Sequence, residues 1–382
     1  EEAPMTQASV AEVVRALRPR YLRARRKDKT RILDEFVALT GYHRKAAIRV
    51  LRNGRKPKEW SRRGRPRVYT PDVKAALLQV WEVCGRICSK RLSPFLPEIV
   101  AVLEREGELK VPPDTRRLLV QMSPATIDRL LATHRCRRGR GRATTKPGIL
   151  LKQAVPIRTF GEWDDARPGY VEMDLVAHCG ESVAGEYLHT LNAVDVATAW
   201  CELAAVHNRS QEAVTKVIDR MRKRLPFPLR GIDSDNDSAF LNAHLYRYCT
   251  DEKIEFTRSR PYKKNDQAHV EQKNWCVVRQ LVGYRRYESR EAWALLEAIY
   301  ADWRRYVNFF QPVRKLVAKE REGSKVRKRY DVARTPFRRV EASPDVPEGP
   351  KEELRAEYLE LNPVLLRRRI DQNLRALGRL PG

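Results

Sequence analysis

The segment Gly169-Tyr-Val-Glu-Met-Asp-Leu-Val-Ala-His178 is the most informative part of this sequence about its fold. It is an apolar run with the length of a buried strand, and it carries a carboxylate, Asp174, near its middle. A charged group in a protein interior costs several kcal/mol unless it is paired or coordinated. We therefore expect Asp174 to share a site with other polar groups.

Two more carboxylates have equally distinctive surroundings. Asp235 ends a second apolar run, and Glu271 lies near the start of a predicted helix after a polar, Pro-led loop. Asp233 lies two residues before Asp235 on the same face of the strand, and it is the alternative candidate for the second metal ligand. Glu172 and Asp195 are expected to be solvated or structural. Three acids at one site predict a hard divalent cation, because Mg²⁺ prefers oxygen ligands.

The hydrophobic pattern changes from helices to strands at about residue 160. It predicts strands over 170–179, 187–195 and 200–206, a helix over 211–225, a strand over 232–235, a helix over 240–251, a strand over 254–260 and a helix over 269–282. This βββαβαβα order is that of a ribonuclease-H-like α/β core, a mixed sheet flanked by helices. Trp275, in the last helix, is expected to belong to the core.

The charge of the chain is strongly positive. Its 382 residues include 76 Lys and Arg against 49 Asp and Glu, a net charge of +27. A basic surface can simply keep a protein soluble, but an excess this large, with clustered arginines, favours nucleic acid as the partner. No apolar stretch approaches the ~20 residues that span a bilayer, and the N-terminus lacks a secretory signal, so we expect no membrane association.

The seven cysteines are scattered, which indicates a reducing cytosol. Cys84 and Cys88, together with His134 and Cys136, could supply the ligands of a zinc site. Their irregular spacing favours buried free thiols instead.

The first sixty residues are predicted to form a helix-turn-helix DNA-binding domain. Ser9-Val-Ala-Glu12 has the pattern of a capping box, and a helix over 29–39 is expected to end at Gly41. In the next helix, one face is apolar and an adjacent face is basic. The apolar residues are Ala47, Ile48 and Leu51, and the basic residues predicted to contact DNA are Arg44, Lys45, Arg49 and Arg52. The alternative is a solvated charged face on an ordinary small bundle.

A basic linker over 61–69 follows, and it contains Arg63-Gly-Arg-Pro-Arg67. This is the core sequence of an AT-hook, in which Arg63, Arg65 and Arg67 would lie in the narrow minor groove of A·T-rich DNA. A short basic linker without that role is the alternative.

Residues 70–134 are predicted to form a second helix-turn-helix DNA-binding domain. Its last helix is capped by Ser123 and turns apolar residues such as Ile127 inward. Thr126 and Arg129 are expected to point away from this core and to contact DNA.

The predicted organisation is therefore multidomain. The helix-turn-helix modules at 1–60 and 70–134 precede a basic linker at 135–160, the ribonuclease-H-like core at 161–288 and a C-terminal region at 289–382. In this last region we expect a long helix, a small basic segment that could form a β-module, and a helical tail.

Three segments resemble the DDE transposase and retroviral integrase superfamily, particularly the integrase-core transposases of bacterial insertion sequences. The segment around Asp174 is similar to the first-Asp strand of that family, and Ile232-Asp-Ser-Asp-Asn236 is similar to its second-Asp segment. The third segment runs from Pro261 to Asn274 and holds Glu271. The 35 residues between Asp235 and Glu271 match the spacing of the family.

The resemblance implies a two-metal catalytic site. Asp174, Asp235 and Glu271 would be the catalytic and metal-binding residues, and each site would hold two Mg²⁺ ions, for which Mn²⁺ can substitute. It also implies that basic residues near the third acid grip phosphates, with a generic basic surface as the alternative. These residues are Lys263, Lys264, Lys273 and Arg279.

The resemblance further implies the reaction of a DNA transposase. Such an enzyme binds the terminal inverted repeats of a mobile element, frees 3′-OH ends by metal-dependent hydrolysis and joins them to target DNA by strand transfer. Its expected partners are double-stranded DNA and further copies of the chain, at least a dimer in a synaptic complex. Its expected location is the bacterial cytoplasm, in association with the nucleoid.

Two residues beside the second acid depart from the family pattern. Asp237 stands where the family usually has Gly, which suits a turn with positive φ, and Ala239 stands where it usually has an acid. An added carboxylate could perturb metal binding. A catalytically inactive DNA-binding regulator is therefore the alternative function, and a structure-selective ribonuclease-H-type nuclease is a third.

Overall fold

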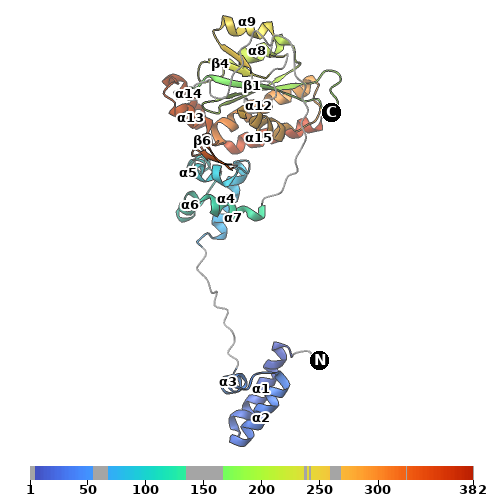
Figure 1. Cartoon of the computed structure of the whole chain (residues 1–382), viewed down its shortest axis with the longest axis vertical. Coiled ribbons are helices and arrows are strands. Elements are labelled where there is room, and N and C mark those ends of the chain that lie inside the picture. The colour runs from blue at the N-terminus through green and yellow to red at the C-terminus, as the bar shows by residue number, and fades with distance from the viewer. Residues whose placement is uncertain are drawn as a thin grey trace. The chain divides into compact units, whose positions relative to one another are not determined.

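The computed structural model describes residues 5–54, 68–134, 167–235, 239–240, 242–258, 268–323 and 325–381. The chain divides into two compact units, with the division between Val68 and Tyr69 (Figure 1). None of the helices within these described ranges is long and apolar enough to cross a membrane.

The N-terminal unit is a bundle of three helices, α1 (Gln7–Arg23), α2 (Arg26–Thr40) and α3 (Arg44–Asn53). Its core is built from one apolar stripe of each helix and includes Val14, Phe36 and Leu51. As predicted, α2 ends at Gly41, whose φ of 69° is left-handed. The predicted capping box is wrong, because α1 begins one turn earlier and Thr6 caps it by accepting from the Ser9 N–H at 3.2 Å.

The second unit contains a five-stranded mixed sheet. Its strands are β1 (Tyr170–Ala177), β2 (His189–Asp195), β3 (Cys201–Val206), β4 (Gly231–Ser234) and β5 (Glu255–Arg258). They lie in the order β3-β2-β1-β4-β5, with the β3–β2 and β2–β1 pairs antiparallel and the β1–β4 and β4–β5 pairs parallel. The predicted strands are confirmed, and the sheet has the topology of a ribonuclease-H-like fold.

Helices cover both faces of the sheet (Figure 1). On one face, α8 (Gln211–Arg222) and α9 (Ala243–Asp251) pack against strand residues such as Met173. The opposite face is covered by α10 (Ala268–Lys273), the π-helix η3 (Asn274–Arg279), α11 (Gln280–Val282) and α12 (Arg290–Phe310). Successive strand residues point to opposite faces, so Asp174 lies on the face covered by α10 and α12.

Helices from the two ends of this unit share one hydrophobic core with α12. They are α4 (Pro71–Val83), α5 (Ser89–Arg105), α6 (Pro113–Val120), α7 (Pro124–Leu131), α13 (Pro336–Ala342), α14 (Glu348–Glu360) and α15 (Pro363–Arg379). The short 3₁₀ turn η1 (Ala132–His134) follows α7, and none of its residues is buried. The Tyr306 hydroxyl of α12 donates to the Val83 carbonyl at 2.6 Å. Glu98 of α5 accepts from Arg338 of α13 and from Tyr358 of α14, each at 2.9 Å. The folding of residues 70–134 as a domain of their own stays a prediction.

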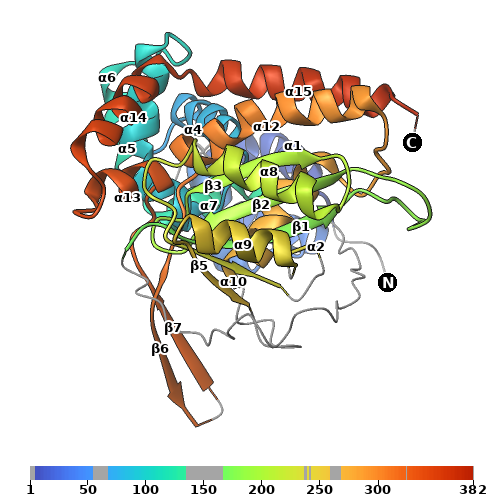
Figure 2. The same ribbon diagram turned by 90° about the horizontal axis from the view of Figure 1, so that it is seen from above.

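A two-stranded antiparallel ribbon, β6 (Leu316–Glu322) and β7 (Lys325–Tyr330), extends from this unit (Figure 2). Its strands project beyond the layers of helices and sheet. The ribbon is the β-element that the sequence suggested for the basic segment of the C-terminal region.

Candidate active site

The first two acids lie on neighbouring strands. Asp174 is half-buried in the middle of β1, and Asp235 directly follows β4 and is also half-buried. The last partners of the parallel β1–β4 ladder are Met173 and Ser234. Continued by one residue, this register puts Asp235 beside Asp174, at roughly the 4.8 Å that separates neighbouring strands. The sheet thus brings together two carboxylates that are far apart in the sequence.

The third acid lies on a helix that a buried carboxylate fastens to β1. Glu271 belongs to the first turn of α10, and its side chain is exposed. The backbone N–H of its neighbour Val270 donates to Oε2 of Glu172 at 2.9 Å, and Glu172 is only 1% exposed. Glu172 and Asp174 are two residues apart in a strand, so both face α10. Glu172 is therefore structural, and it holds the helix of Glu271 against the strand of Asp174.

A chain of polar side chains links Asp174 to the middle of the sheet. Nδ2 of Asn274 donates to Oδ2 of Asp174 at 2.5 Å, and Oδ1 of Asn274 accepts from Nδ2 of Asn192 at 2.7 Å. Asn192 is the register partner of Asp174 on β2, and its Oδ1 accepts from the Cys201 thiol at 3.3 Å. The Leu175 N–H donates to Oδ1 of Asp174 at 2.8 Å. Both carboxylate oxygens of Asp174 are thus held.

The sequence interpretation missed the role of Asn274. The signal for it was its position three residues after Glu271, because residues three apart lie on one side of a helix. The helix widens to π geometry at Asn274, a feature that is frequent at functional sites. Trp275 is 44% exposed, so its predicted place in the core is wrong. Because Asn274 faces the sheet, the next residue is rotated by about 100° toward solvent.

Asp233, the alternative second ligand, is completely buried. Its Oδ1 accepts from the Thr257 hydroxyl of β5 at 2.8 Å. Its register partner on β1 is Glu172. This buried pair of acids therefore lies two residues before the half-buried pair, Asp174 and Asp235, on both strands. A half-buried carboxylate can bind a metal ion that also contacts a substrate phosphate, whereas a fully buried carboxylate cannot reach such an ion. This difference favours Asp235 over Asp233 as the second metal ligand.

Asp195 also has a structural role. It accepts from the Gly169 N–H at 2.8 Å, and from the N–H and the hydroxyl of Thr198 at 2.7 and 2.6 Å. Burial raises the pKa of Asp195 to about 6, although these hydrogen bonds oppose the rise. The carboxylate thereby ties the start of β1 to the turn between β2 and β3.

The donor set of the site suits a divalent cation, because it consists of carboxylate oxygens. Among the described residues, which include all three acids, no group of three or more His, Cys, Asp or Glu side chains is arranged to hold a metal ion. Carboxylates repel one another when no cation lies between them, and an exposed side chain such as that of Glu271 has several rotamers open to it. Metal binding would therefore require the three acids to draw together.

The described residues give little support to the alternative zinc site. Burial raises the pKa of the Cys84 thiol to about 12, which disfavours the thiolate that zinc binds. Cys88 is exposed, and Cys136 lies outside the described residues. Cys84 is instead a buried free thiol.

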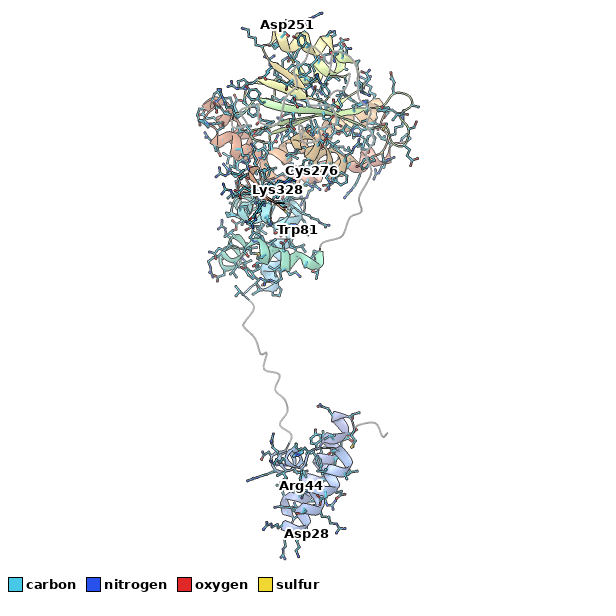
Figure 3. The ribbon with its side chains drawn as sticks, viewed as in Figure 1. Asp28, Arg44, Trp81, Asp251, Cys276 and Lys328 are labelled. Atoms are coloured by element: carbon cyan, nitrogen blue, oxygen red, sulfur yellow. The ribbon has the colours of Figure 1, made fainter. Side chains whose placement is uncertain are left out.

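The basic face predicted on α3 is exposed to solvent. Figure 3 labels one of its residues, Arg44. Its members are Arg44, Lys45, Arg49 and Arg52, of which Arg44 forms an ion pair with Asp34 of α2. Of the three residues on the predicted apolar face, Ala47 and Leu51 are buried, whereas Ile48 is 37% exposed. The core contacts of α3 follow the line through Ala47 and Leu51, four residues apart, and Ile48 lies beside that line.

Two residues that were predicted to contact DNA are buried. Thr126 is 8% exposed, because the cap residue Ser123 draws it inward: its hydroxyl lies 3.1 Å from Ser123 Oγ and accepts from Arg129 at 3.3 Å. Lys273 is also 8% exposed, because it lies on the part of α10 that packs against the sheet, next to Asn274. Arg129 is exposed, in agreement with its predicted outward direction.

Further predicted DNA contacts lie outside the described residues. They are the AT-hook-like arginines Arg63, Arg65 and Arg67, and the loop residues Lys263 and Lys264. Asp237 is also outside them, whereas Ala239 is described and is buried.

Comparison with known proteins identifies the family of the chain. Residues 164–264, which include Asp174 and Asp235, match the family described as "Integrase core domain". Over 327 residues the chain is 46% identical to "Uncharacterized protein y4rM" of Sinorhizobium fredii, a match that covers 85% of this chain and 93% of that relative. With its mixed sheet and its integrase core, the chain belongs to the DDE transposase and integrase superfamily of polynucleotidyl transferases.

Proposed function

We propose that this protein is a DNA transposase, which frees the 3′-OH ends of a mobile element and joins them to target DNA. The observation that carries the proposal is the register of β1 and β4, which leads Asp235 to the side of Asp174, beneath the helix of Glu271. These three acids are the proposed catalytic residues and the proposed ligands of two Mg²⁺ or Mn²⁺ ions.

The residues around the acids prepare the site for this chemistry. When bound, the divalent cations would activate the attacking oxygen and stabilise the leaving oxygen. Asn274 and the Leu175 N–H fix the carboxylate of Asp174 before substrate arrives. Glu172 keeps the start of α10, and with it Glu271, against β1. Water would be the nucleophile for hydrolysis and the freed 3′-OH for strand transfer, so neither step needs a covalent bond to the protein.

The charge and the exposed basic residues support a DNA substrate. The net charge of +27 suits a polyanion, and the basic face of α3 belongs to a small unit separate from the catalytic sheet. Such a unit is suited to reading the terminal repeats while the second unit carries out the chemistry. Joining two ends at one target requires two active sites, so we propose a dimer or larger assembly.

Strand transfer by the purified protein tests the proposal. The substrates are duplexes that end in the inverted repeats flanking the gene, already cut at the 3′ end, together with supercoiled plasmid and Mg²⁺. Joined products are expected with Mg²⁺ or Mn²⁺, and none with a chelator. Binding of these duplexes without nicking or joining would contradict the proposal and favour the inactive regulator that Asp237 and Ala239 motivate. Cleavage of RNA–DNA hybrids with no action on DNA ends would favour a ribonuclease-H-type nuclease.

A further inference from the structure

The β6–β7 ribbon combines high exposure with high positive charge. Residues 316–330 contain six Lys or Arg and two Glu. Among its described side chains, every one except Ala318 is exposed, and Figure 2 shows the ribbon extending beyond the helices. A two-stranded hairpin with both faces in water is marginally stable by itself. The ribbon therefore has an open surface for a partner, and its charge favours a polyanion.

The register divides this charge unequally between the two faces, because directly opposed residues share a face. On one face Lys319 is opposite Lys328, and Arg321 is opposite Val326. We call this the cationic face; it has three basic positions and no acid. A pair of like charges directly opposite one another destabilises a hairpin. An external anion at this face would remove that repulsion.

The other face carries both acids of the ribbon. Glu320 is opposite Arg327 and Glu322 is opposite Lys325, with Arg329 nearer the root. Arg327 also forms an ion pair with Glu322 at 3.3 Å. Its basic residues are thus largely offset within the ribbon, unlike those of the cationic face.

The root of the ribbon is fixed to the catalytic unit. Asp331, which follows β7, accepts from the Lys315 N–H and from the Arg339 guanidinium, each at 2.7 Å. Nζ of Lys315 donates to the carbonyl of Ala197, between β2 and β3, at 2.8 Å. The direction of the ribbon is therefore set by the body of the unit, which suits an arm that positions a rigid partner.

From these observations we propose that the β6–β7 ribbon is a DNA-binding arm that enters the major groove with Arg321 and Lys328 toward the phosphates. The major groove of B-DNA, about 12 Å wide, admits a two-stranded ribbon, whereas the minor groove, about 6 Å wide, does not. The deep, narrow major groove of A-form RNA excludes it as well. The inference rests on the proposed function only in taking duplex DNA as the partner.

Two double variants of the full chain, equal in charge lost, test the arm. Arg321→Gln with Lys328→Gln changes the cationic face, and Arg327→Gln with Arg329→Gln is the matched control on the other face. Binding of a random-sequence duplex is measured in a chelator over a range of salt concentrations. For the cationic-face variant we expect affinity for DNA to fall on the order of tenfold. The slope of log K against log salt concentration should decrease in magnitude by about 2, because each phosphate contact contributes about 0.9 to that slope. The control should change much less.

Dimethyl sulfate footprinting shows separately which groove the protein occupies, because this reagent methylates guanine N7 in the major groove. Wild type and control should protect guanines that the cationic-face variant leaves reactive. Equal losses of DNA affinity in both double variants would show that only the net charge of the ribbon matters, and this result would overturn the proposal. So would unchanged DNA binding with a shifted monomer–dimer equilibrium in sedimentation, which would assign the arm to a second copy of the chain. Because no metal is present, these results do not depend on whether the protein performs strand transfer.

Discussion

At the scale of single residues, the acids of the sheet differ in what surrounds their carboxylates. Glu172, Asp195 and Asp233 are buried and accept hydrogen bonds from the protein itself. Asp174 and Asp235 are half-buried. Carboxylates that are satisfied internally stabilise the fold, whereas accessible ones can bind an external cation. The degree of burial thus separates the two proposed ligands on the sheet from their structural neighbours.

We expect Asn274→Ala to weaken metal binding rather than DNA binding. The change removes the donor that orients Asp174. Mutation of a residue that hydrogen-bonds a metal ligand typically lowers metal affinity or activity by about 10–100-fold. The Mg²⁺ concentration for half-maximal strand transfer should therefore rise, while affinity for DNA in a chelator stays at the wild-type value. An unchanged Mg²⁺ requirement would refute this role for Asn274.

The raised pKa of Asp195 predicts a pH dependence of stability. The folded protein binds this proton up to about pH 6, whereas the unfolded chain releases it near the ordinary value of 3.8. The contribution of Asp195 to the free energy of unfolding therefore decreases as pH rises from about 4 to about 6, by roughly 3 kcal/mol. Urea unfolding at several pH values, compared with Asp195→Asn, should show wild type losing stability relative to the variant over this range. Parallel pH curves would contradict the assignment.

At the scale of elements, the site depends on how α10 and η3 are attached to β1. Two contacts make the attachment: the Val270 N–H donates to Glu172, and Asn274 donates to Asp174. They are one helical turn apart and bracket Glu271. The position of the third acid is therefore set by backbone and side-chain bonds to the strand of the first.

Two variants of Glu172 separate the hydrogen bond from the charge. Glu172→Ala leaves the buried Val270 N–H without its acceptor, which we expect to cost about 1–3 kcal/mol of stability. Glu172→Gln keeps an acceptor oxygen and should lose less. Chemical denaturation measures the difference, and strand transfer should decrease in the same order. Equal destabilisation by both variants would indicate that the negative charge, not the hydrogen bond, matters here.

The sequence was sufficient to predict the five strands and their order along the chain. Alternating and continuous apolar runs define β1 to β5, and the acids stand in characteristic segments. It was not sufficient for contacts that depend on strand register, such as Asn192 beside Asp174. Nor did the pattern on α7 reveal that Thr126 turns inward, because that direction depends on its bond with Ser123.

At the scale of the whole molecule, the catalytic sheet is built into a larger helical body. The helices α4 to α7 share a hydrophobic core with α12 and the C-terminal helices. Part-buried polar contacts add to it: Arg91 donates to the Pro312 carbonyl, and Gln311 donates to the Cys84 carbonyl at 2.8 Å. Segments from the two ends of the unit therefore support each other, while the N-terminal bundle has its own core.

This arrangement predicts the behaviour of two fragments. A chain of residues 69–381 retains the shared core and should melt cooperatively as a monodisperse protein. A chain that starts at residue 161 lacks α4 to α7, which uncovers apolar surface around Tyr306 and removes the Glu98 partner of Tyr358. We expect it to aggregate or to melt at a clearly lower temperature. Equal melting temperatures by calorimetry would show that the catalytic core does not need these helices.

We propose that Asp174 and Asp235, which the β1–β4 register leads to one place, carry out phosphodiester chemistry with Glu271. Single-turnover strand transfer by Asp174→Asn, Asp235→Asn and Asp233→Asn tests it most directly. The rate of the first two variants should fall about a thousandfold. A decrease of this size corresponds to about 4 kcal/mol less stabilisation of the transition state by the metal ions. Asp233→Asn can still accept from Thr257 and should remain within about tenfold of wild type, since it loses no metal ligand. A wild-type rate for Asp174→Asn or Asp235→Asn, or a decrease for Asp233→Asn as large as theirs, would show that these two carboxylates are not the catalytic pair.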